Sequence, residues 1–128
     1  MNLNDKQNQV KADIEKMAEI FGIDPNWAVA VALTESSLGL NQMSPTGCRG
    51  VFQISSIAMQ DLWLLMGQYD DELVDIVCGI AFLRLLLRRW GSINTATAHY
   101  CAPLDRNLYI DRVRNYMKEL LGIQVKEG

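Results

Sequence analysis

Apolar side chains recur at intervals of three and four residues through most of this 128-residue chain, which is the spacing of amphipathic helices. The first predicted helix spans about residues 4–21. In it Val10, Ile14 and Met17 lie about one turn apart, and Gly22 follows as a stop signal. The many polar positions between them indicate a helix that buries one face.

The second predicted helix is apolar on nearly every side. Asp24 can cap its free backbone amides, and Pro25 suits a first turn, where no N–H bond is lost. Residues 27–33 are almost wholly apolar. This pattern indicates a buried helix, and it places Glu35 at the carboxyl end of that helix.

The helical pattern breaks over residues 39–50, where GLNQMSPTGCRG carries three glycines and a proline. The next segment, VFQIS, predicts a short strand or turn. Further helices are expected, with Ser55 or Ser56 capping the first, at about residues 55–66, 72–90, 92–100 and 105–121. The helix over 72–90 is interpreted as the central core helix, and Gly122 is expected to end the last one. The predicted fold class is all-α, or α+β at most, with one small β-hairpin or turn.

Composition favours a single domain over residues 1–128, because 49% of the residues are hydrophobic and can form one core. The net charge of −3 argues against binding nucleic acid or anionic lipid through the overall field, although Arg84, Arg88 and Arg89 form a local basic group. Charged residues interrupt the apolar run over 72–90, so we expect no membrane span. We expect a monomer, and the amino-terminal sequence has no secretory signal pattern.

The three cysteines, Cys48, Cys78 and Cys101, show no CxxC spacing, and His99 is the single histidine. Neither a zinc site nor a complete disulfide framework is indicated. We therefore expect buried or free thiols, no metal and no cofactor.

Glu35 is the leading candidate for chemistry. Burial disfavours its ionised form, and so does the partial negative charge of a helix carboxyl end; both raise its pKa. A glutamic acid that stays protonated near neutral pH can donate its proton to the leaving-group oxygen of a glycosidic bond. The alternative interpretation is a solvated surface acid at a helix end.

Four short segments occur in a meaningful order along the chain. They are Glu35-Ser36 with the loop SPTGCRG from Ser44 to Gly50, then Gly50-Val51-Phe52-Gln53, then Asp75-Ile76-Val77-Cys78-Gly79, and finally His99-Tyr100-Cys101-Ala102-Pro103. Together they resemble the motifs of the soluble lytic transglycosylase (SLT) family, a branch of the lysozyme-like superfamily with goose-type lysozymes as relatives. The resemblance covers about residues 20–117, and the order of the segments carries more weight than any one of them.

Three positions depart from the family pattern. Asp75 and Cys101 stand where the family has asparagine, and Pro103 stands where a glycine often gives the backbone freedom. These changes bear on substrate affinity and loop shape more than on catalysis.

The resemblance implies a turn that lines a substrate cleft, and an enzyme that cleaves the β-1,4 bond between N-acetylmuramic acid and N-acetylglucosamine in peptidoglycan. Glu35 would protonate the glycosidic oxygen and then, as a base, take the proton from the muramic acid C6 hydroxyl, which leaves a 1,6-anhydro product. One carboxylate therefore suffices. Residues 36–60 contain no Asp or Glu, so a lysozyme-style nucleophile would have to be a more distant acid such as Asp61, Asp70 or Asp75.

The resemblance also implies supporting roles for Ser36, Ser44, Thr46, Gln53 and Tyr100. Ser44 and Thr46 resemble loop hydroxyls that hydrogen-bond the catalytic glutamate, or else they satisfy turn backbone. Gln53 offers a donor and an acceptor to sugar groups, or is an exposed strand residue. Tyr100 can donate toward the reacting sugar, or is a core aromatic with its hydroxyl at the surface.

Two other functions stay open. One is a muramidase, which would leave a reducing end by hydrolysis. The other is a catalytically weak peptidoglycan-binding or structural component of a virion or secretion apparatus; the altered motif around Cys101 favours it and the presence of Glu35 opposes it. His99 is not expected to act directly, because adjacent helical residues such as Tyr100 point elsewhere. We expect a bacteriolytic role at the bacterial cell wall, in phage lysis, in a virion or as part of a larger exported protein.

Overall fold

The computed structural model describes residues 1–40, 50–53, 72–100 and 106–127, and within these ranges it contains five helices. They are α1 (Asp5–Phe21), α2 (Pro25–Ser36), α4 (Glu72–Trp90), α5 (Ile93–Tyr100) and α6 (Arg106–Glu127). These ranges contain no strand, and the part of VFQIS that is described forms a turn. The all-α class is thus confirmed for the described part of the chain. The helix expected near residues 55–66 lies outside it.

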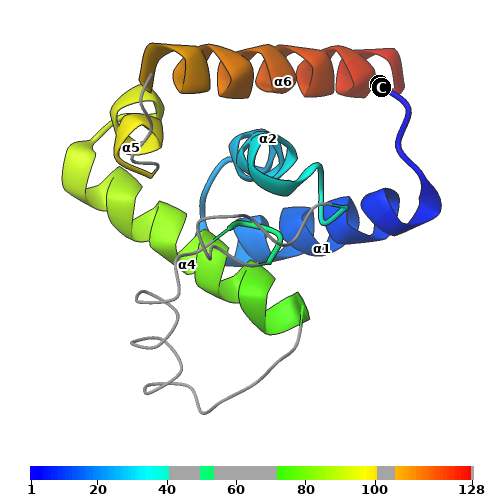
Figure 1. Ribbon diagram of the computed structural model, residues 1–128, viewed down its shortest axis with the longest axis horizontal. Coiled ribbons are helices and arrows are strands. Elements are labelled where there is room, and N and C mark those ends of the chain that lie inside the picture. Colours follow the sequence, from blue (N-terminus) through cyan, green and yellow to red (C-terminus); the bar gives the residue numbers. More distant parts are fainter. Residues whose placement is uncertain (41–49, 54–71, 101–105, 128) are drawn as a thin grey trace.

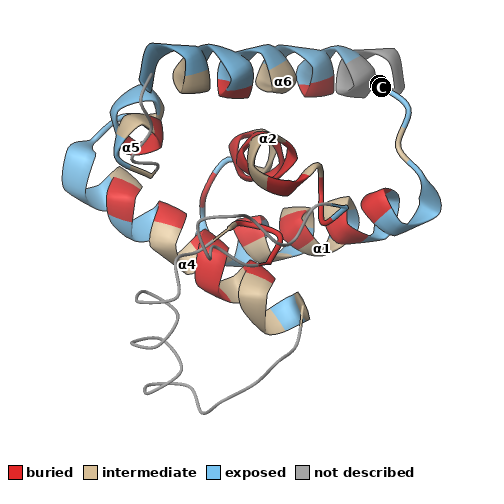
Figure 2. Ribbon diagram, viewed as in Figure 1, coloured by how far each residue is buried: buried red, intermediate tan, exposed pale blue. Residues whose placement is uncertain are grey.

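Helix α2 occupies the centre of the molecule. Figure 1 shows it end-on between α6 and α1, and it packs against both. Burial extends almost all the way around it (Figure 2), over Trp27, Ala28, Val29, Ala30, Val31, Ala32, Leu33 and Ser36. The indole Nε1 of Trp27 donates to Thr97 Oγ1 of α5 at 2.9 Å, so the polar atom of this buried ring has a partner.

Helix α4 packs against α1 and α5 with one face, so the prediction that residues 72–90 form the central helix is wrong. Its buried residues are Ile76, Cys78, Gly79, Ile80, Leu83 and Leu86, whereas Arg84, Leu85 and the last turn face solvent. The central place belongs to α2 because alternate alanines at 28, 30 and 32 let neighbouring helices approach from several sides.

The predicted starts of α1 and α2 are confirmed. Asn4 caps α1, and the Asn4 and Gln7 side chains each accept from the other's backbone N–H, at 2.8 and 3.0 Å, as a capping box. Asp24 caps α2 by accepting from Asn26 N at 2.9 Å, with Pro25 in the first turn.

The two glycines expected to end helices behave differently. Gly22 has a φ of 72° and ends α1 in the left-handed conformation. Gly122 does not take a positive φ, and α6 continues through it to Glu127. The predicted stop at Gly122 is therefore wrong, because a glycine ends a helix in this way only where the backbone turns left-handed. Val113 and Leu120 anchor α6 in the core.

Candidate functional site

Glu35 lies in the last turn of α2, one residue before the helix ends at Ser36. Helix α6 packs along α2 and brings Tyr109 to it, 74 residues further along the chain. The phenolic hydroxyl of Tyr109 donates to Glu35 Oε1 at 2.6 Å, the short distance typical of a charge-assisted hydrogen bond. The carboxylate is only partly exposed, so the interpretation of Glu35 as a fully solvated surface acid is wrong.

Burial raises the pKa of Glu35 above its ordinary value, and the hydrogen bond from Tyr109 lowers it by a smaller amount. The net shift is upward because removing the carboxylate from water penalises its charged form. The direction predicted from the sequence is confirmed, with burial as the main cause. A carboxyl group in this environment holds its proton to higher pH than a solvated glutamate does.

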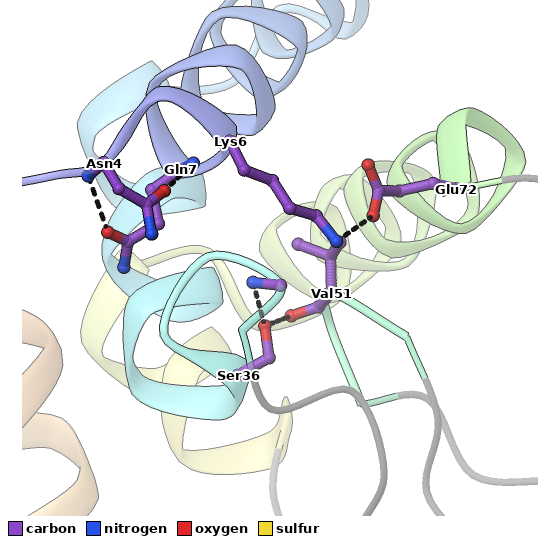
Figure 3. Close-up of polar contacts among 7 residues, drawn as sticks. Asn4, Lys6, Gln7, Ser36, Val51 and Glu72 are labelled. Carbon is purple, nitrogen blue, oxygen red and sulfur yellow. Dashed lines mark hydrogen bonds and ion pairs between the residues drawn. The ribbon is translucent and has the colours of Figure 1, made fainter.

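Ser36 joins the end of α2 to the turn at residues 50–53. Its side chain is buried, and Oγ lies 2.5 Å from the Val51 carbonyl oxygen (Figure 3). It also lies 3.2 Å from the Ala32 carbonyl oxygen. Ser36 Oγ accepts from Gly39 N at 3.0 Å. The Ser36 hydroxyl thus ties the end of α2, one residue after Glu35, to the turn that forms the second motif.

The turn Gly50–Gln53 is held by α4 and α5 as well. The hydroxyl of Tyr100, in α5, donates to the Phe52 carbonyl oxygen. Phe52 is buried against Gly79 of α4, where an added Cβ would lie 2.7 Å from Phe52 Cβ and closer still to the ring. Gly79 therefore allows a contact that any side chain would prevent. Because Ser36 also binds this turn, residues from all four motifs meet here.

The polar groups of Gln53 and Tyr100 both bond to backbone carbonyl oxygens of the turn. The sequence predicts that Gln53 either binds sugar or is an exposed strand residue, and that Tyr100 either binds sugar or has a surface hydroxyl. Gln53 is left-handed, with a φ of 51°, so it is not a strand residue, and its Nε2 donates to Gly50 O at 2.8 Å. The ring of Tyr100 packs against the core, as one alternative expected, but its hydroxyl donates to the Phe52 carbonyl oxygen and is not left at the surface. Contacts from these two residues to sugar stay predictions.

Other predicted positions are placed as follows. Ser44, Thr46, Cys48, Cys101 and Pro103 lie outside the described residues. The Asp75 carboxylate lies against Gly50, where an added Cβ would be 2.7 Å from Oδ2. Cys78 is a buried cysteine whose thiol pKa is raised by burial and then, to a smaller extent, by the charge of Asp75. His99 is exposed and stacks on Trp90 with ring centroids 3.7 Å apart.

Sequence reasoning placed Tyr109 only in the apolar register of the last helix, together with Val113, Tyr116 and Leu120. The sequence carries one signal, which shows that Tyr109 needs a polar partner but not which helix supplies it. A tyrosine on a core-facing register needs a partner for its hydroxyl, and the neighbouring apolar helix carries a single acid, Glu35.

In a comparison with known families, residues 13–119 match the family described as Transglycosylase SLT domain. No curated protein and no solved structure matches the chain. Within the residues that the structure describes, no three or more His, Cys, Asp or Glu side chains gather as a metal site would need. No helix in the same ranges has the length and apolar character of a membrane span.

Proposed function

Because the chain belongs to the transglycosylase SLT family, which implies peptidoglycan lytic transglycosylase activity in general, we propose that Glu35 is the group that carries this reaction. The observation behind the proposal is the environment of this carboxyl group. It lies at the end of the central helix with a raised pKa, and a tyrosine from another helix fixes one of its oxygens. Residues 1–128 are proposed to form one domain around this group.

The proposed reaction uses Glu35 twice. The protonated carboxyl gives its proton to the glycosidic oxygen as the bond from that oxygen to C1 of the muramic acid breaks. The resulting carboxylate then takes the proton of the C6 hydroxyl, and O6 forms a bond to C1. The carboxyl group ends in its starting state, no water is consumed, and the products are a 1,6-anhydro end and a free 4-hydroxyl.

Two contacts support this role for Glu35. Tyr109 donates to Oε1, so we assign the transferable proton to Oε2. Ser36, the residue after Glu35, hydrogen-bonds to the Val51 carbonyl oxygen. This bond holds the end of α2 against the turn that carries Gln53. A catalytic acid needs this kind of fixed placement, because misplacement by about 1 Å can cost about 10²-fold in rate.

A muramidase of the same fold is the second candidate. The position of the Asp75 carboxylate favours it. This carboxylate lies beside Gly50, at the turn that Ser36 ties to the end of α2. Hydrolysis needs a second carboxylate to activate water or to act as a nucleophile. Asp75 would be that group, and the chemical nature of the products separates the two reactions.

The pH dependence of the reaction tests the proposed acid. Glu35 must be protonated to act first, so kcat/KM should fall as pH rises through its raised pKa. The Tyr109→Phe variant loses the hydrogen bond that lowers this pKa but keeps the burial that raises it. Its descending limb should therefore lie at higher pH than that of the wild type. We expect this in kcat/KM on soluble glycan fragments whose charge stays constant between about pH 5 and 9.

Tyr116→Phe is the matched control, because Tyr116 lies on the same helix and is also partly buried. Its descending limb should coincide with that of the wild type. A limb in Tyr109→Phe that stays in place or moves to lower pH would show that Glu35 does not control the alkaline side of the profile.

A further inference from the structure

The beginning of α1 precedes the family match, which starts at residue 13, yet it contacts the end of α2. Gln7 is buried in the first turn of α1, with 8% of its surface exposed. Its side-chain Nε2 donates to the Ser37 carbonyl oxygen at 2.9 Å, 30 residues along the chain. A residue outside the matched segment thus binds the backbone two positions after Glu35.

The backbone that Gln7 binds is strained. Ser37 and Leu38 have φ values of 51° and 56°, and Gly39 follows with 88°. Residues with a side chain rarely adopt this left-handed conformation, so surrounding contacts must hold it. The N–H groups of Ser37 and Leu38 bond back to Leu33 and Ala32 of the helix at 3.1 and 3.3 Å, and Leu38 is fully buried. The side-chain amide of Gln7 donates a hydrogen bond to the Ser37 carbonyl oxygen, within this left-handed segment.

The capping box of α1 orients the Gln7 amide. Its Oε1 accepts from the Asn4 N–H at 3.0 Å (Figure 3). The Nε2 end of the same amide therefore faces the Ser37 carbonyl oxygen. A reversed amide would lose both hydrogen bonds, because it would set a donor against the Asn4 N–H and an acceptor against the Ser37 carbonyl. The arrangement therefore fixes one orientation of the side chain.

We propose that Gln7 is a positioning residue for Glu35, an inference that rests on the proposed function of this glutamate. Loss of the bond to Ser37 would free the left-handed end of α2. That would shift Glu35 relative to Tyr109 and Ser36 relative to the Val51 carbonyl. The first turns of α1 precede the segment that matches the family. They would then contribute to catalysis through the backbone of α2, without touching substrate.

The test is the Gln7→Glu variant. A glutamate at this position can still accept from the Asn4 N–H in a capping box, but its ionised side chain cannot donate to Ser37. On soluble glycan fragments at neutral pH, we expect kcat to fall by about tenfold with KM changed by less than about twofold. Gln9→Glu is the matched control. It makes the same substitution on an exposed part of α1 and should keep the wild-type kcat.

A second variant, Gln7→Met, removes the donor without adding charge and should show the same loss of kcat. Wild-type kcat in Gln7→Met would overturn the proposal, because the loss in Gln7→Glu would then come from repulsion by the new carboxylate. Wild-type kcat in both variants would overturn it as well.

Glu35→Gln in the same assay separates this inference from the proposed function. Full activity of Glu35→Gln would remove the proposed function and the role of Gln7 together. An inactive Glu35→Gln beside fully active Gln7 variants would remove the role of Gln7 alone.

Discussion

Glu35→Gln should lose about 10²–10⁴-fold in the rate of peptidoglycan cleavage and keep the fold of the wild type. The amide has the shape of the carboxyl group and can still accept from Tyr109 at Oε1. It cannot transfer a proton to the glycosidic oxygen, nor take one from the C6 hydroxyl. The measurement is the clearing of purified sacculi, with circular dichroism to show that the helices and the melting temperature are retained.

Glu119→Gln is the control for this prediction. It makes the same substitution at an exposed position of α6 and should clear sacculi at the wild-type rate. If Glu35→Gln cleared sacculi as fast as Glu119→Gln, Glu35 would not be the acid, and the proposed reaction would have no proton donor.

Gly79→Ala should lower the free energy of unfolding by about 1–3 kcal/mol, the usual cost of overpacking a core. The new methyl group would overlap Phe52, lying 2.7 Å from its Cβ and closer to its ring. Phe52 is 1% exposed and cannot swing into solvent. Its carbonyl also accepts from Tyr100, so a shift of Phe52 would disturb the turn that carries Gln53. Urea unfolding measures the loss.

Gly122→Ala is the matched control, because it places the same methyl group in a helix where no atom lies within 4 Å. Alanine favours the helix over glycine by up to about 1 kcal/mol, so this variant should be slightly more stable than the wild type. Equal stability of Gly79→Ala and the wild type would show that Phe52 does not pack against α4 in solution.

The helix starts could be predicted because their chemistry is local. Asn4, Asp24 and Pro25 act within three residues of their own positions, through backbone amides that every helix start leaves free. The position of each helix in the core depends on contacts between distant parts of the chain, so the local sequence does not predict it. Both α2 and α4 carry long apolar runs, and periodicity alone does not say that small alanines would put α2 in the centre.

Part of the candidate site could likewise be predicted from the local sequence, and part could not. Glu35 and Ser36 are adjacent in the sequence, and the end of an apolar helix already predicts a raised pKa for the glutamate. Tyr109 and Gln7 reach the same helix end across 74 and 30 residues, a pairing that only the packing of α6 and α1 on α2 determines. The roles of Ser44 and Thr46 and the expected phage origin stay predictions.

The most direct test of the account is the chemistry of the new glycan ends. Sacculi digested with the wild-type protein in water enriched in oxygen-18 are analysed by mass spectrometry, with Glu35→Gln as the blank. Transglycosylation by a single carboxylate predicts 1,6-anhydro-muramic ends without the heavy isotope, because no water enters the product. Reducing ends that carry oxygen-18 would contradict the account. They would show hydrolysis and direct attention to Asp75 as a second carboxylate.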